Sequence, residues 1–125
     1  MPASIRIIRA KDFIHATPRG EVKLGKSEEM LERIVAATQD LDQFQILIDV
    51  RRSTGKLTPQ ELWQLAQKLQ KYRTTFSQRT AVLTPFERKD RAEFFALCAG
   101  STGFNIQVFT SYEDAMRYLL DDEEI

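Results

Sequence analysis

The 125-residue sequence has few of the residues that build metal centres and covalent cross-links. It contains one cysteine, Cys98, which excludes an internal disulfide and a cysteine-rich metal site. Its one histidine, His15, argues against a multi-histidine metal centre and against a histidine-driven pH switch. His15 has no second histidine and no cysteine near it in the sequence, and catalytic use would need a positioned nucleophile or carboxylate partner. We therefore expect no catalytic residues, no metal and no cofactor.

The sequence also lacks net charge and long apolar runs. Its 18 basic residues balance 18 acidic ones, which argues against a broad basic surface for nucleic acid. No apolar run approaches the roughly 20 residues of a membrane span, and the first residues contain no signal-peptide core. We expect a cytoplasmic protein that binds no nucleic acid and has no integral membrane segment. The length predicts a single domain over 1–125, with a flexible acidic tail at 121–125.

Strands and helices alternate along most of the chain. Two short β-branched or aromatic runs predict an N-terminal hairpin over 5–9 and 13–17, closed off by a turn at 18–20. Continuous or alternating apolar runs predict three further strands, at 45–50, 80–83 and 105–109. Apolar residues at helical spacing predict four helices, at 27–38, 58–72, 84–100 and 111–120.

Capping residues mark where these helices should begin. Ser27 and Ser111 are candidate N-caps of the first and last helices. The second and third helices should each open on a Thr-Pro-x-Glu capping box, one starting at Thr58 and the other at Thr84.

The resulting order of elements is β-β-α-β-α-β-α-β-α. Alternating strands and helices form a parallel sheet through right-handed crossovers, whereas the hairpin must add an antiparallel strand. The sequence therefore predicts a three-layer α/β domain with a mixed sheet of about five strands.

Three stretches of the sequence share a further pattern: ILIDVRRSTGKLTPQEL, RTAVLTP and FNIQVFTSYEDAMRYLL. They resemble the bacterial SpoIIAA-like family, which has the anti-sigma-factor-antagonist (STAS) fold, and the resemblance covers about residues 21–120. The shared features are an apolar strand that ends in Asp and a basic residue, an Ala-Val strand, and a last helix whose Ala115 precedes Tyr118-Leu119. These features specify a fold more than an activity.

The resemblance implies a small non-enzymatic module that acts in regulation or binds an apolar or anionic ligand. Anti-sigma-factor antagonists expose a phosphorylatable serine in an Asp-Ser-Ser-Gly-like setting before the helix that follows the central strand. Here Ser53 or Thr54 comes near that place, but two arginines precede them and the spacing differs. This departure weakens the inference to a kinase-controlled partner switch.

The segment 49–58 is the main candidate for binding, since ligands of parallel α/β sheets collect beyond the carboxyl ends of the strands. Its charged and hydroxyl side chains could hold an anion or a partner. Thr84 and Arg88 should follow the next strand end. The candidate residues are Asp49, Arg51, Arg52, Ser53, Thr54, Thr84 and Arg88. The simpler interpretation is a solvated loop in which Asp49 pairs with an arginine.

Two other patterns have ordinary explanations. The run from Ser53 to Thr58 contains Gly-Lys, but it lacks the first glycine and the Ser or Thr of a phosphate loop. The basic run Arg88-Lys89-Asp90-Arg91 is most simply a solvated helix face.

The helix that contains residues 94–99 is apolar around its whole circumference. Only one of its faces can meet the sheet, so the other must meet a helix, a ligand or a second subunit. Trp63, Phe94 and Phe95 are candidates for a homodimer interface, and packing between neighbouring helices is an equal alternative.

Three functions therefore remain open from the sequence. The first is a non-enzymatic module that binds a protein partner or itself. The second is a domain that binds a small lipid-like or anionic ligand. An enzyme is the least supported, and a cleft that brought Asp49 and His15 within hydrogen-bond reach would favour it.

Overall fold

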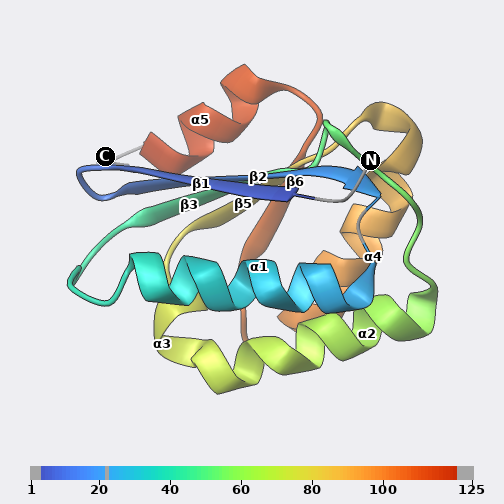
Figure 1. Ribbon diagram of the computed structural model, residues 1–125, viewed down its shortest axis with the longest axis horizontal. Helices are drawn as coiled ribbons and strands as arrows, with labels where there is room; N and C mark the ends of the chain where they lie inside the picture. The colour runs from blue at the N-terminus through green and yellow to red at the C-terminus, as the bar shows by residue number, and fades with distance from the viewer. Residues whose placement is uncertain (1–3, 22, 121–125) are drawn as a thin grey trace.

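The protein is an α/β sandwich with a mixed central sheet (Figure 1). The computed structural model describes residues 4–21 and 23–120, so the predicted acidic tail lies outside the described residues. The strands are β1 (Ser4–Ala10), β2 (Phe13–Glu21), β3 (Gln45–Asp49), β4 (Ser53–Thr54), β5 (Thr80–Leu83) and β6 (Ile106–Phe109). The helices are α1 (Leu24–Ala37), α2 (Pro59–Lys68), α3 (Arg73–Phe76), α4 (Lys89–Gly100) and α5 (Tyr112–Leu120), with 3₁₀ turns η1 (Leu69–Tyr72) and η2 (Phe86–Arg88).

The sheet has the order β1-β2-β3-β5-β6. β1 and β2 form the predicted antiparallel hairpin, and the pairs β2–β3, β3–β5 and β5–β6 are parallel. The carboxyl ends of the parallel strands β2, β3, β5 and β6 therefore lie at one edge of the sheet. The predicted three-layer fold and element order are confirmed, with one addition, because the two-residue β4 pairs in parallel with the end of β2.

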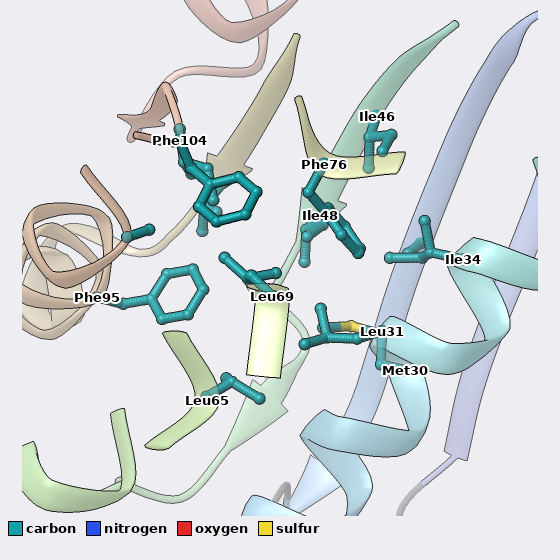
Figure 2. Close-up of a cluster of buried hydrophobic side chains, with 14 of the residues drawn as sticks. Met30, Leu31, Ile34, Ile46, Ile48, Leu65, Leu69, Phe76, Phe95 and Phe104 are labelled. Atoms are coloured by element: carbon teal, nitrogen blue, oxygen red, sulfur yellow. The ribbon is translucent and has the colours of Figure 1, made fainter. Parts of the chain in front are cut away.

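The larger core lies on the sheet face that is covered by α1, α2, α3 and α4. Strand residues at alternate positions, such as Ile14, Ile46 and Ile48, supply its floor. Figure 2 shows Leu31 of α1 and Phe95 of α4 pointing from opposite sides into the space above that floor. This core fixes the positions of the three helices that surround the candidate site.

The opposite sheet face carries α5 and a smaller core. Leu47, Ala81 and Leu83 occupy the other alternate positions of β3 and β5, and they pack against Ala115 and Leu119 of α5. The stripe predicted for the last helix is therefore confirmed. Ser111 also caps α5, since its hydroxyl accepts a hydrogen bond from the Asp114 N–H at 3.3 Å.

The predicted turn at 18–20 is wrong, because β2 continues to Glu21. β3 pairs with β2 only as far as Ala16, so Pro18 has no β3 residue that needs its missing N–H. Gly20 adopts a φ of 80°, which glycine tolerates best, and it pairs with Ser53 of β4. A proline in the middle of β2 is thus accommodated where one side of the strand is unpaired.

The predicted helix starts have mixed outcomes. The Thr58 box is confirmed: Thr58 Oγ1 accepts from the Glu61 N–H at 3.1 Å, and Glu61 accepts from the Thr58 N–H at 2.9 Å. Ser27 is not an N-cap, because Leu24 packs against the core and α1 begins there, which leaves Ser27 buried inside the helix. The box at Thr84 is also wrong, since η2 intervenes and α4 begins at Lys89 without a side-chain cap.

Candidate functional site

An apolar cavity of about 130 Å³ lies between the sheet and helices α1, α2 and α4, partly open to solvent. Its walls come from elements that are distant in the sequence but share the larger core. The segment 50–58, which follows β3, borders it. The apolar lining residues are Pro18, Met30, Leu31, Ile48, Val50, Leu57, Leu62, Leu65, Val82, Ala92 and Phe95.

Polar groups occupy a limited part of this lining. They are Ser27, Ser53, Thr54, Thr84, Arg88 and Arg91. Ser27 and Thr84 are buried, whereas both arginines are half-buried. The cavity therefore combines an apolar body with two cations, which is the composition of many small-molecule sites.

The guanidinium of Arg88 holds the segment that follows β3. Its Nη2 donates to the carbonyl oxygens of Val50 at 2.9 Å and Ser53 at 2.8 Å. Its Nη1 lies 3.4 Å from the Ser53 hydroxyl, which in turn donates to Val50 O at 2.8 Å. These bonds explain why the short β4 forms although it contains only two residues.

Arg91, which lies in the first turn of α4 and three residues after Arg88, holds the next part of the same segment. Its Nη1 donates to the Leu57 carbonyl at 2.6 Å. A guanidinium carries five N–H groups. Within the described chain, the bond to Leu57 is the only hydrogen bond of the Arg91 side chain. Within residues 4–21 and 23–120, neither Arg88 nor Arg91 forms an ion pair with a carboxylate.

Asp49 and Arg51 lie on the other side of the sheet from the cavity, because Asp49 has the same strand parity as Leu47. The Arg51 guanidinium forms a bidentate pair with Asp49, in which Nε donates to Oδ1 and Nη2 donates to Oδ2, each at 3.0 Å. Burial alone would raise the pKa of Asp49, but hydrogen bonds from the Arg51 guanidinium and backbone N–H outweigh it and hold this pKa below its ordinary value. Asp49 is thus a paired, buried carboxylate.

His15 lies beside this pair on β2. Its Nε2 is 3.9 Å from Asp49 Oδ2, which is beyond hydrogen-bond distance. The Nε2 atom is buried and has no hydrogen-bond partner in the described part of the chain. A hydrogen bond between His15 and Asp49 was the arrangement that would have favoured an enzyme, and the two side chains lie side by side without forming one.

The sheet divides the predicted binding residues into two groups. Ser53, Thr54, Thr84 and Arg88 come together at the cavity. Asp49 and Arg51 pair on the opposite face, and Arg52 is exposed with its carbonyl accepting from the Gly20 N–H at 3.4 Å. Adjacent residues of one loop thus serve different sides of the sheet.

Sequence reasoning missed two polar residues of the cavity, Ser27 and Arg91. Arg91 belongs to the basic run that we interpreted as a solvated face, yet it is half-buried. The three-residue spacing between Arg88 and Arg91 was the available signal, because residues at that spacing share a helix face. Ser27 was hidden by its assignment as an N-cap.

The predicted interface residues also differ in position. Phe95 is buried and lines the cavity, whereas Trp63 is 52% and Phe94 38% exposed. Leu97, one turn from Phe94 on α4, is 70% exposed. At the carboxyl edge of the sheet, Phe86 is 77% exposed, and the sequence analysis did not single it out.

Comparison with known proteins identifies the fold. No family model matches the sequence, and no curated protein is significantly similar to it. Among solved structures, one similar chain is an uncharacterised protein with a SpoIIAA-like fold from Shewanella loihica PV-4. It has 20% identity and a TM-score of 0.60, and the match covers 94% of this chain and 93% of that one.

A second similar structure is an anti-sigma factor antagonist from Mycobacterium paratuberculosis. It has 16% identity and a TM-score of 0.62, and 94% of each chain is covered. The protein therefore has the SpoIIAA-like fold that the three sequence stretches indicated. Among its described helices, none is both long and apolar enough to cross a membrane.

Proposed function

We propose that this protein is a non-enzymatic regulatory module that acts in the cytoplasm by binding another protein. The docking surface in this proposal is the carboxyl edge of the sheet, between η2 and the segment 50–58. An anti-sigma factor antagonist with the same fold supports a regulatory role, although the two chains are only 16% identical. The pairing of Asp49 with Arg51 supports the non-enzymatic part, because it occupies the one buried carboxylate at this edge in the described chain.

The exposure of Phe86 carries this proposal. At 77% exposure, it leaves most of an aromatic residue in water at the edge where parallel α/β folds bind their ligands. Buried aromatic residues dominate the binding energy of protein interfaces. Arg88, two residues later, bonds to Ser53, so Phe86 and the segment 50–58 belong to one continuous rim.

Site-specific photo-crosslinking tests this proposal. A benzophenone amino acid would replace Phe86 in cells that naturally express the chain, and Leu97 would be replaced in a matched control. We expect a discrete adduct from position 86 that position 97 does not give, and we expect Arg52→Glu to reduce it. Identical adducts from both positions, or none from position 86, would contradict the proposal.

Self-association is a second candidate, favoured by the exposure of Phe94 and Leu97 on one face of α4. Contiguous exposed apolar patches mark interaction sites, and these two side chains would form the centre of such a patch. Light scattering after size-exclusion chromatography should then give twice the 14.5 kDa chain mass at micromolar concentration. Leu97→Glu should return the monomer mass, and a monomer at all concentrations would exclude this candidate.

A further inference from the structure

We propose that the cavity between α1, α2 and α4 binds a small amphipathic carboxylate, with the carboxylate on Arg91 and an apolar body of about six carbons inside. This site is separate from the docking surface at Phe86. Two observations carry the proposal: the apolar lining of the cavity and the two half-buried arginines that border it.

The lining determines the body of the ligand. Leu31, Leu65 and Phe95 converge on this space from three helices (Figure 2). Apolar cavities take up apolar molecules, and an enclosed one of about 150 Å³ holds a benzene ring. The volume of about 130 Å³ therefore suits a six-carbon chain or a single ring.

The arginines determine the head group. Lysine and arginine are rarely buried unless they are paired, and in the described chain neither Arg88 nor Arg91 has a carboxylate partner. An anion at the mouth of the cavity would supply that missing charge. A planar carboxylate matches the fork of a guanidinium and forms two charge-assisted hydrogen bonds with it.

Arg91 is better placed than Arg88 to receive the ligand. Both Nη2 hydrogens of Arg88 are directed at the carbonyls of Val50 and Ser53, and its Nη1 is close to the Ser53 hydroxyl. Arg91 uses only Nη1, on Leu57 O. Its other N–H groups can bind a carboxylate while the segment 50–58 stays in place. The structure thus gives Arg88 a positioning role and Arg91 a binding role.

The test is a titration of the full ¹⁵N-labelled chain, followed by heteronuclear NMR, with three probes. Hexanoate has both the head and the body, hexan-1-ol has the body alone, and acetate has the head alone. We expect the largest shifts at cavity residues such as Leu65 and Val82, with intermolecular NOEs from the hexanoate methyl group to Phe95. Hexanoate should bind about tenfold more tightly than hexan-1-ol, as expected for a charged hydrogen-bonded pair, and acetate should not bind.

Substitutions on α4 separate the head from the body. Arg91→Gln should lower hexanoate affinity to that of hexan-1-ol and leave hexan-1-ol affinity unchanged. Lys89→Gln is the matched control, because Lys89 is a cation of the same helix that pairs with Glu93 at 3.8 Å and does not line the cavity. It should leave all affinities unchanged.

Several results would overturn the proposal. One is the absence of chemical-shift changes at hexanoate concentrations up to 20-fold above a dissociation constant of about 1 mM. Another is a set of shift changes spread over the surface arginines. A third is equal hexanoate affinity in Arg91→Gln and the parent chain. If Arg91→Gln binds neither hexanoate nor hexan-1-ol because the segment 50–58 opens, the measurements on the parent chain decide whether the site exists. Equal affinity for hexanoate and hexan-1-ol there, or NOEs away from Phe95, would refute the site.

Discussion

Asp49 shows how the setting of one residue decides its role. Its place at the end of the most apolar strand made it a candidate for ligand binding, and the structure gives it Arg51 instead. The alternative that Asp49 simply pairs with an arginine was stated from the sequence, but the choice of Arg51 rather than Arg52 was not. The turn after β3 explains that choice, because the Arg51 N–H donates to Asp49 Oδ1 at 3.0 Å and so places the Arg51 side chain beside the carboxylate. Arg52 is exposed, and its carbonyl accepts from the Gly20 N–H instead.

The Asp49–Arg51 pair should make stability depend on pH. Because the folded pKa of Asp49 is lowered, its stabilising effect is complete above the unfolded value of about 3.9 and is lost as the pH falls through the folded value. In Arg51→Gln, the buried carboxylate loses its partner. We expect this variant to be less stable by about 1–2 kcal/mol at pH 7, with the difference shrinking below about pH 4.

Urea denaturation between pH 2 and pH 7 measures this difference. Arg52→Gln is the matched control, since it removes a neighbouring exposed cation, and its effect should be small at every pH. A direct ¹³C titration of the Asp49 carboxyl should show a higher pKa in Arg51→Gln. A difference in stability that stays constant from pH 7 to pH 2 would show that the pair does not act through ionisation.

At the scale of elements, two copies of one sequence pattern have different outcomes. Thr58 and Thr84 both begin Thr-Pro-x-Glu, yet only Thr58 opens a helix with a capping box. The Thr84 N–H donates to Phe109 O at 2.9 Å, which extends the β5–β6 pairing by one residue, and its buried hydroxyl donates to Pro85 O at 3.1 Å. A bond to a strand 25 residues away is invisible to local pattern analysis.

The α2 capping box gives a prediction at this scale. Thr58→Ala should lower the free energy of unfolding by about 1 kcal/mol, because the Glu61 N–H loses its acceptor. Thr58→Ser keeps the hydroxyl and should stay within about 0.5 kcal/mol of the parent chain. Chemical denaturation followed by circular dichroism measures both variants, and equal stability of the two would show that the box contributes nothing.

At the scale of the whole molecule, the two faces of the sheet are unequal. In the described chain the larger core contains 19 buried residues, whereas the core under α5 contains five. Elements with little buried apolar contact open locally at lower free energy than the rest of the protein. We therefore expect α5 to be the helix that detaches first.

Native-state hydrogen exchange measures this detachment. Amide protons of α5 should exchange through an opening of lower free energy than those of β3 and β5. Leu119→Ala should lower the opening free energy of the α5 amides by about 2–4 kcal/mol. The opening free energy of the amides between β2 and β3 should change less. A single opening free energy shared by α5 and the sheet would contradict this view.

The layout of the whole molecule was predictable because apolar spacing changes between strands and helices. The strands around Ile48 and Val82 and the stripe of α5 all follow from that spacing. The cavity was not predictable, because it depends on how Leu31, Leu57 and Phe95 meet across three separate segments. Periodicity identifies which face of an element is buried, and it does not say whether the buried faces fill the space between them.

The bonds made by Arg88 of η2 and Arg91 of α4 also determine when the rim of the cavity is completed during synthesis. Arg88 acts on Val50 and Ser53 across 38 and 35 positions, and Arg91 acts on Leu57 across 34. A growing chain that has emerged only as far as β5 can already pair β4 with β2, but it lacks both guanidinium groups. The arginine contacts at the rim of the cavity can form only after η2 and α4 have been synthesised, so they are completed late in biogenesis.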